Sequence, residues 1–239
     1  MKTISFLDVD FSVAPAAHWH EVLLTSDPAA PLRLIVTPNV DHVVRLSEDA
    51  GLRAIYAAAD YRICDSRILA RLGRMRGIKL MTYPGSDMVR DLLADPRSAL
   101  LPISVTGPDR ANFERLCALF PGHRLIHVPA PIMAPGTEAW DTALAAVEAS
   151  GAALHLLCLG FPKQEQFAAD LVRRGAAGGH ALCVGAAVDF LTGHQVRAPA
   201  LMQMAGLEWL HRLASNPGRL WRRYLIEGPK VFALYRKLR

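Results

Sequence analysis

Polar and small residues follow four apolar, strand-like runs of the sequence, at the points where parallel strands would end. They are Thr37 and Asn39, Thr106 and Gly107, Gln164 and Glu165, and Gly185 and Asp189. Ligands of parallel α/β sheets bind beyond the carboxyl ends of the strands. The amides, hydroxyls and carboxylates at these ends therefore predict one binding site that is assembled from several loops.

Two of these groups have chemistry that suits a phosphorylated ligand. Gln164 and Glu165 fall in the first turn of an expected helix, where free backbone N–H groups favour anions. Gly185 opens a loop of small residues that lets the backbone approach a nucleotide closely. Plainer structural roles stay open: Glu165 complements the helix dipole, the Gly185 loop forms a tight turn, and a Pro-Asn turn at Asn39 caps the next helix.

Asp65 is a candidate for acid–base chemistry. It follows the apolar residues Ile63 and Cys64 and precedes a segment with helical periodicity. A carboxylate at this place either caps the helix expected over residues 66–76 or takes a proton from a substrate hydroxyl as a general base. The residues alone leave both roles open, and the two are compatible.

The elements that position these residues alternate between short β-rich runs and longer helix-periodic segments. Strands are expected over residues 3–7, 32–37, 103–106, 124–128, 154–159 and 181–184. Helices are expected over residues 41–58, 66–76, 86–93, 109–120, 138–150 and 163–174. This alternation predicts an α/β fold, with a Rossmann-like, mostly parallel sheet that is covered by helices on both faces.

Positive charge is concentrated at the C-terminal end. The formal net charge is +5, from 27 Lys and Arg against 22 Asp and Glu. Eight of the basic residues come after residue 211, where Glu227 is the only acidic residue. The pattern breaks at Arg197-Ala198-Pro199, and the helical segments that follow mix cations with aromatic and aliphatic residues, as interfacial helices do. We therefore divide the chain into a body, residues 1–195, and a helical, membrane-associating appendage, residues 196–239.

The cations of this appendage suit three uses. Arg212, Arg219, Arg222 and Arg223 are able to neutralise a leaving diphosphate or to bind anionic lipid headgroups, and a solvated helix face is the plain alternative. The aliphatic residues between them fit lipid better than a phosphate backbone, so we expect no nucleic-acid partner.

Several other classes of protein are disfavoured. The chain has no run of about 18 apolar residues, and its first residues enter a strand-like run, so we expect neither a membrane span nor a signal peptide. The four cysteines are scattered among apolar neighbours, which is typical of buried thiols in a reducing cytoplasm. The nine histidines have no ligand spacing, and Asp8-Val9-Asp10 lacks further placed ligands, so we expect no metal site.

Three ordered blocks of sequence carry a family resemblance. The first is Thr37-Pro38-Asn39 with Asp65, and the second is Leu159-Gly160-Phe161-Pro162-Lys163-Gln164-Glu165. The third and most specific consists of Val184-Gly185, Asp189-Phe190, Gly193, Arg197-Ala198-Pro199, Gly206-Leu207-Glu208-Trp209-Leu210, Arg212-Leu213, Pro217, Arg219 and Arg222-Arg223-Tyr224. With this order and spacing, the chain resembles the WecG/TagA/CpsF glycosyltransferases from about residue 3 to about residue 224.

The resemblance implies an inverting, metal-independent transferase of bacterial surface polysaccharide synthesis that uses no cofactor. It implies a UDP-sugar donor, an acceptor sugar on a polyprenyl diphosphate, and Asp65 as the catalytic carboxylate. The appendage would complete the site at an anionic membrane surface, with substrate contacts from Arg197, Glu208, Arg212, Arg219, Arg222 and Arg223. The protein is then expected to be cytoplasmic and peripheral on the inner face of the plasma membrane.

Other features of the sequence leave questions open. Asp65-Ser66-Arg67 stands where many members read Asp-Gly, and Thr82-Tyr83-Pro84 stands where an arginine is often expected, so the donor sugar is not fixed. The Asp-Ser-Arg form is more similar to members that use glucose-type sugars. The alternative functions are a metal-dependent phosphatase that uses Asp8 and Asp10, and a non-catalytic nucleotide-binding adaptor. The oligomeric state is open, with a homo-oligomer among the alternatives.

Overall fold

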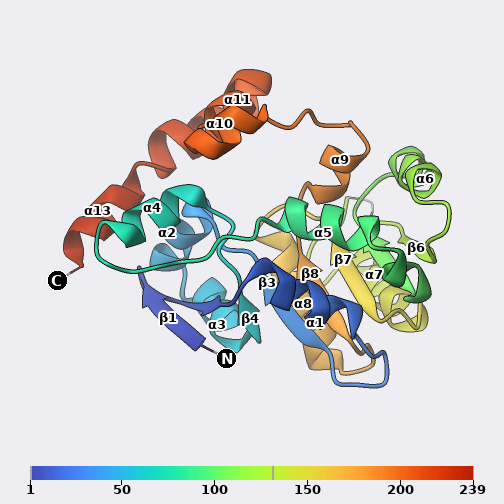
Figure 1. Ribbon diagram of the computed structural model, residues 1–239. Coiled ribbons are helices and arrows are strands. Elements are labelled where there is room, and N and C mark those ends of the chain that lie inside the picture. Colours follow the sequence, from blue (N-terminus) through green and yellow to red (C-terminus); the bar gives the residue numbers. More distant parts are fainter. Residues whose placement is uncertain (1, 131, 239) are drawn as a thin grey trace.

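The computed structural model describes residues 2–130 and 132–238, with the side chains of Ala200 and Arg219 outside the described part. Its centre is a six-stranded sheet with the strand order β4-β3-β8-β7-β5-β6 (Figure 1). The strands are β3 (Arg33–Val36), β4 (Tyr61–Arg62), β5 (Ile103–Thr106), β6 (Leu125–Val128), β7 (Leu154–Leu157) and β8 (His180–Cys183). All their pairings are parallel, which confirms the predicted fold class.

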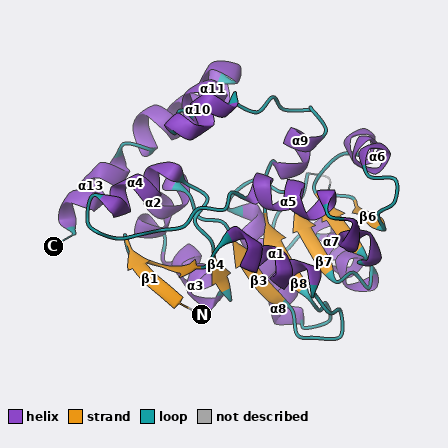
Figure 2. Cartoon of the chain, in the orientation of Figure 1, coloured by secondary structure: helices purple, strands orange, loops and turns teal. Residues whose placement is uncertain are grey.

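Helices cover both faces of the sheet (Figure 2), because successive side chains of a strand point to opposite faces. In β8, Ala181 and Cys183 pack into one apolar core and Leu182 packs into the other. The helices that pack into the first core are α2 (Val40–Glu48), α3 (Ala50–Ala58), α4 (Arg67–Arg74), α7 (Glu138–Ala149) and α8 (Lys163–Arg174). Those that pack into the second core are α1 (Ala16–Leu24), α5 (Gly85–Ala94), α6 (Arg110–Leu119) and α9 (Ala187–Leu191).

The first predicted strand lies outside this sheet. β1 (Lys2–Phe6) pairs antiparallel with β2 (Val9–Val13) as a two-stranded ribbon. Both turn residues, Leu7 and Asp8, have positive φ angles of 52° and 58°. Two residues with positive φ form a type I′ turn, which joins adjacent antiparallel strands, whereas a parallel pair needs a much longer crossover.

Two predicted helices are each broken into two. The segment over residues 41–58 divides at Asp49, whose extended backbone ends α2 and whose carboxylate caps α3 by accepting the N–H of Leu52 at 3.0 Å. The helix expected after Pro199 breaks at Gly206, which has a left-handed φ of 71°. In both cases a local polar or glycine residue ends the first helix.

The C-terminal helices run over α4 and α2 along one side of the molecule (Figure 1). They are α10 (Ala200–Ala205), α11 (Glu208–Ser215), α12 (Pro217–Trp221), a π-helical turn over Arg222–Glu227, and α13 (Lys230–Lys237). These elements lie within residues 196–239, the appendage. None of the described helices is both long enough and apolar enough to cross a membrane.

The appendage is fixed to the body at both of its ends. The guanidinium of Arg71 in α4 donates hydrogen bonds of 2.6 and 2.9 Å to the carbonyls of Ala205 and Met204, which end α10. At the other end, Tyr235 of α13 packs edge-on against Phe6 of β1, with 6.5 Å between ring centroids. The division of the chain at residues 195 and 196 into two folding units stays a prediction.

Candidate active site

Asp65 lies at the carboxyl end of the sheet, where three segments of the chain meet. Its backbone N–H donates to the carbonyl of Pro38, just after β3, at 3.0 Å. Its carboxylate accepts a hydrogen bond of 3.0 Å from the backbone N–H of Gly85, the first residue of α5. A parallel bridge between Cys64 and Thr82 aligns the two segments. The fold thereby gathers the ends of β3 and β4 and the start of α5 around one carboxylate.

Burial raises the pKa of Asp65 to about 7. The low-polarity surroundings disfavour the charged carboxylate, and the negative charge of Glu208 acts in the same direction. Hydrogen bonds from Gly85 and from the side chain of Asn39, together with the positive charge of Arg212, oppose the rise. A carboxylate whose pKa lies near neutrality is well matched to accepting a proton from a hydroxyl group.

Helix capping, the other role considered for Asp65, belongs to its neighbour. Ser66 is the N-cap of α4, and its Oγ accepts the backbone N–H of Leu69 at 3.3 Å. The carboxylate of Asp65 is directed toward Gly85 and Asn39 instead. The structure therefore separates the cap from the candidate base.

Asn39 serves both the helix and the site. Its side-chain oxygen caps α2 by accepting the N–H groups of Asp41 and His42 at 3.0 and 3.4 Å, while the side chain also hydrogen-bonds Asp65. The hydroxyl of Thr37 is buried and donates to the carbonyl of Cys183 at 2.8 Å. Thr37 therefore ties the end of β3 to β8, and Asn39 is the member of the pair that reaches the candidate base.

Gln164 lies at the start of α8 and holds the loop after β8. Its Oε1 accepts the backbone N–H of Gly185 at 2.9 Å, and its Nε2 donates to Glu165 at 3.0 Å. Gly185 has a left-handed φ of 56°. The two residues that were predicted from separate loops are thus joined directly, with Gln164 only 3% exposed.

Glu165 points into the protein rather than toward a substrate. It is fully buried, and its Oε1 accepts the hydroxyl of Tyr56 at 3.3 Å. That hydroxyl also hydrogen-bonds Nδ1 of His42 at 3.0 Å. Burial raises the pKa of Glu165 to about 7. Because its carboxyl holds the amide of Gln164, Glu165 has the geometry of a positioning residue.

Three further predicted residues maintain the loops around the site. Thr106 is fully buried at the end of β5. Gly107 has a φ of 125°, and a Cβ there would lie 2.5 Å from the carbonyl oxygen of Cys158. Asp189 in α9 accepts hydrogen bonds of 2.8 and 2.7 Å from Asn112 and Gln195. These contacts hold neighbouring elements together.

The appendage brings charged side chains to Asp65. Glu208 and Arg212 are four residues apart on α11, and the charges of both act on the Asp65 carboxylate. Arg197, before α10, donates to Asp87 of α5 at 2.7 Å. The charges of α11 thus act on the candidate base, and α5 connects that base to the segment that leads into α10.

The remaining predicted arginines lie farther along the appendage. Nε of Arg223 lies 3.2 Å from the buried carboxylate of Asp41 in α2. Arg222 is exposed and lies 3.8 Å from Glu227. The side chain of Arg219 lies outside the described part of the chain. Of this group, Arg223 contributes to docking the appendage on the body.

Sequence reasoning missed several partners of these residues. They are Gly85, Asp87 and Asp41, which contact Asp65, Arg197 and Arg223 respectively. Gly85 and Asp87 occur in the first turn of α5, where an amide N–H group and a carboxylate are both common. That pattern marks a helix start but does not reveal which distant residue it meets.

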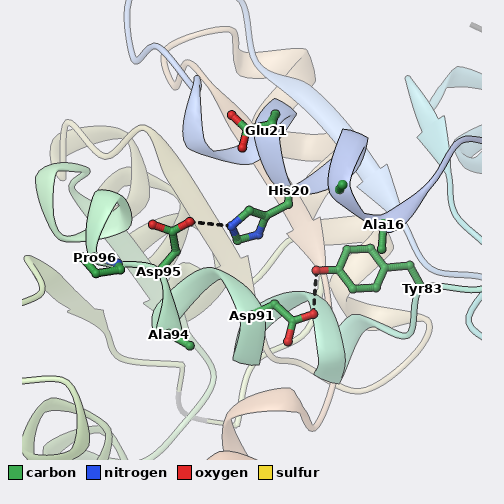
Figure 3. A pocket seen from close by; sticks show the side chains of 9 residues that line it. Ala16, His20, Glu21, Tyr83, Asp91, Ala94, Asp95 and Pro96 are labelled. Atoms are coloured by element: carbon green, nitrogen blue, oxygen red, sulfur yellow. Dashed lines mark hydrogen bonds and ion pairs between the residues drawn. The ribbon is translucent and has the colours of Figure 1, made fainter.

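An open pocket of about 550 Å³ lies elsewhere, between α1 and α5 (Figure 3). His20 hydrogen-bonds Asp95 at 2.9 Å on one side of it, and the hydroxyl of Tyr83 donates to Asp91 at 3.1 Å on the other. None of the predicted site residues lines this pocket. The carboxylates of Asp91 and Asp95 are each hydrogen-bonded to another residue that lines the pocket. Asp65 does not line the pocket, so this is a different place from the candidate active site.

The acidic pair at the start of the chain is placed differently from Asp65. Asp8 is in the hairpin turn, and Asp10 accepts a hydrogen bond from Ser5 within the β1–β2 ribbon. Neither is at the carboxyl end of the parallel sheet. Within residues 2–130 and 132–238, no group of three or more His, Cys, Asp or Glu side chains has an arrangement that could hold a metal ion.

A known protein family matches nearly the whole chain. The sequence model of the Glycosyl transferase WecG/TagA/CpsF family matches residues 4–239, which is nearly the whole chain. This family makes cell-surface polysaccharides by transferring a sugar from a nucleotide-sugar donor to a lipid-linked acceptor. The match spans both the sheet that carries Asp65 and the appendage. The chain belongs to the WecG/TagA/CpsF family of glycosyltransferases.

Proposed function

We propose that the protein is an inverting, metal-independent glycosyltransferase that moves a sugar from a UDP-sugar to a sugar on a polyprenyl diphosphate. The observation that carries the proposal is the placement of Asp65. Its carboxylate is held by Gly85 and Asn39 and lies under the charges of Glu208 and Arg212. This is a buried carboxylate held by hydrogen bonds, as suits a general base, at the edge of the sheet where α/β proteins bind ligands.

In the reaction, the acceptor hydroxyl oxygen forms a bond to the anomeric carbon of the donor sugar. The bond from that carbon to the UDP oxygen breaks on the opposite face, and UDP leaves with the electron pair. Asp65 takes the hydroxyl proton. The charge that develops on UDP is neutralised by arginines and backbone N–H groups. Arg212 is assigned to this role because its positive charge acts on Asp65.

Donor binding is assigned to the loops around the sheet edge. Asn39 lies there, and the buried amide of Gln164 holds the backbone of Gly185 in place. Thr37, Thr106, Gly107, Glu165 and Asp189 support these loops from within. The site uses no cofactor in this proposal.

The appendage is the part of the chain that meets the membrane in this proposal. Its exposed apolar side chains are Leu201, Met204, Leu207, Leu210, Trp221, Leu225, Ile226 and Phe232. Arg222 and the other cations lie among them, which suits the interface of an anionic bilayer. We therefore place the protein on the inner face of the plasma membrane, peripheral to it.

Replacement of the base tests the function. Asp65→Asn keeps an oxygen that accepts from Gly85 but cannot take a proton, so we expect kcat to fall by about 10²–10⁴ while UDP binding stays unchanged. The matched control is Asp91→Asn, which removes a carboxylate from the same part of the fold outside the site. Transfer that persists in Asp65→Asn at the rate of the control would exclude the mechanism.

The donor sugar is identified by thermal unfolding with a panel of UDP-sugars. A ligand that binds only the native state at 100 times its Kd stabilises the protein by about 2.7 kcal/mol, which is a measurable shift in Tm. The sugar that gives the largest shift over UDP alone is the donor to use with lipid-linked acceptors.

A further inference from the structure

A cationic pocket lies on α4, the helix that follows the candidate base, and one of its lining residues belongs to the appendage. It has a volume of about 360 Å³, and its lining includes Arg67, Arg71, Arg74, Thr82, Leu80 and Met204. No Asp or Glu is among the residues that line it. Its polar lining is therefore of one sign, and its character is that of a receptor for an anion.

The three arginines project from one face of α4. Positions 67, 71 and 74 are separated by four and three residues, so their side chains are neighbours on the helix surface. Arg71 is engaged with the carbonyls at the end of α10. Arg67 and Arg74 make no hydrogen bond or ion pair with any side chain in the described part of the chain. Like charges at this spacing repel each other, which an anion in the pocket would relieve.

The pocket shares its framework with Asp65. Arg67 follows Asp65 by two residues, and Thr82 is the bridge partner of Cys64, which immediately precedes Asp65. The segment after Thr82 leads to Gly85, which donates to the Asp65 carboxylate. The segments that carry Asp65 and Gly85 therefore each adjoin a residue that lines the pocket.

One wall of the pocket is apolar and open to the surface. Leu80 is buried at its base, whereas Met204 of α10 is 66% exposed at its edge. Leu201, one turn before Met204 on the same helix, is also exposed. Cations next to exposed apolar side chains match a molecule whose phosphate groups are attached to a hydrocarbon chain.

We propose that the pocket formed by Arg67, Arg71, Arg74 and Thr82 binds the diphosphate group of the lipid-linked acceptor. The hydrocarbon chain leaves past Met204 and Leu201. This proposal rests on the proposed function, because it takes the acceptor to be a lipid diphosphate. It assigns acceptor binding to arginines of the body, in addition to those of the appendage.

The test uses Arg67→Gln, Arg74→Gln and the double variant in the full-length protein. Arg71 is left in place because it holds α10. The control is Arg115→Gln, which removes an exposed cation from α6. The ligand is farnesyl diphosphate, a short prenyl diphosphate, and its binding is measured by calorimetry, with UDP binding measured alongside.

We expect the double variant to bind farnesyl diphosphate about tenfold more weakly or worse, since charge-assisted hydrogen bonds to both arginines are lost. UDP binding stays unchanged, and in the transfer assay the KM for a lipid-linked acceptor rises while kcat changes little. Arg115→Gln behaves as the unmodified protein. Because calorimetry needs no turnover, this result is independent of whether Asp65 proves to be the base.

Unchanged affinity for farnesyl diphosphate in the double variant overturns the proposal. Sedimentation with phosphatidylglycerol and phosphatidylcholine vesicles tests the alternative ligand, which is the phosphate of bilayer headgroups. If the double variant loses binding to the anionic vesicles while its farnesyl diphosphate affinity is intact, the arginines bind bilayer headgroups, and the proposed acceptor site is likewise excluded.

Discussion

The backbone N–H of Gly85 donates a 3.0 Å hydrogen bond to the carboxylate of Asp65. This contact ties the candidate base to the first residue of α5. Two residues later, Asp87 accepts a hydrogen bond of 2.7 Å from Arg197, which lies at the start of the appendage, before α10. The start of α5 therefore contacts both the base and the segment that leads to α10. The pKa of the base depends in turn on the charges of α11, which follows α10.

The pH dependence of transfer is expected to follow the charges around Asp65. The base must be deprotonated, and its pKa is about 7, so kcat/KM rises with pH through about 7. Glu208→Gln removes a charge that raises this pKa and shifts the rise to lower pH. Arg212→Gln removes a charge that lowers it and shifts the rise to higher pH. The pH–rate profiles of the two variants are compared.

Glu114→Gln, which removes an exposed carboxylate on α6, is the control for these profiles and should leave the rise in place. Shifts of Glu208→Gln and Arg212→Gln in the same direction would show that the titrating group is not Asp65.

Glu165 is expected to make the protein less stable as pH rises. Burial raises its folded-state pKa from an ordinary 4.5 to about 7, so between these values the native state keeps a proton that the unfolded state has released. The free energy of unfolding then falls with rising pH, by an order of about 3 kcal/mol for a shift of this size. Glu165→Gln has no proton to release and should flatten this dependence, as measured by urea unfolding at pH 5 and pH 8.

Glu165→Gln also separates stability from activity. The variant retains an oxygen for Tyr56 and Gln164, so a loss of kcat would show that the orientation of the Gln164 amide depends on the carboxylate. Asp65 has a raised pKa as well, so its titration also lowers the free energy of unfolding as pH rises. A pH dependence of stability equal to that of the unmodified protein would show that Glu165 does not carry a raised pKa.

Gly107 should tolerate no side chain. Its φ is 125°, and a Cβ would lie 2.5 Å from the carbonyl oxygen of Cys158. Gly107→Ala is expected to lower the free energy of unfolding by about 3 kcal/mol or more, from strain and collision together. Gly136→Ala is the control, since Gly136 has a φ of 79° with nothing near its Cβ, and it should cost about 1–2 kcal/mol. If Gly107→Ala and Gly136→Ala lower the free energy of unfolding equally, in thermal or urea unfolding, the backbone has moved to relieve the collision at residue 107.

Membrane binding through the appendage is tested on two adjacent exposed residues. Leu225 and Ile226 are 52% and 51% exposed, so Leu225→Glu with Ile226→Glu should leave folding intact. Burial of such a side chain in the interface contributes about 1.5–3 kcal/mol, so vesicle binding should fall at least tenfold in flotation assays. Leu119→Glu on α6, where Leu119 is 54% exposed, is the matched control. Equal binding by all three proteins would place the membrane contact elsewhere.

The parallel sheet was predictable because its longer strands are short β-rich apolar runs that end at turn residues. β5 was predicted with the observed bounds, since Ile103–Thr106 is apolar and followed by Gly107. β4 was missed because two residues make no periodic signal. α1 was missed because its only fully buried residues are Trp19 and Leu23 and no side chain caps its start.

The candidate site was predictable as a set of strand ends but not as a set of contacts. Asn39, Gln164 and Gly185 lie where parallel strands end, which is a rule of topology. The pairing of Asp65 with Gly85 depends on a bridge between Cys64 and Thr82 that no local pattern encodes. The inward direction of Glu165 likewise depends on Tyr56, from a different helix, whose hydroxyl it accepts.

Phe6 and Tyr235 belong to opposite ends of the sequence, yet their rings are in contact. A ribosome that adds about 5–20 residues per second needs roughly 10–50 s to pass from one to the other. During this interval the β1–β2 ribbon exists without α13 against it, and the part of Phe6 that Tyr235 contacts remains uncovered. The contact between the first strand and the last helix thus forms only after nearly the whole chain has been synthesised.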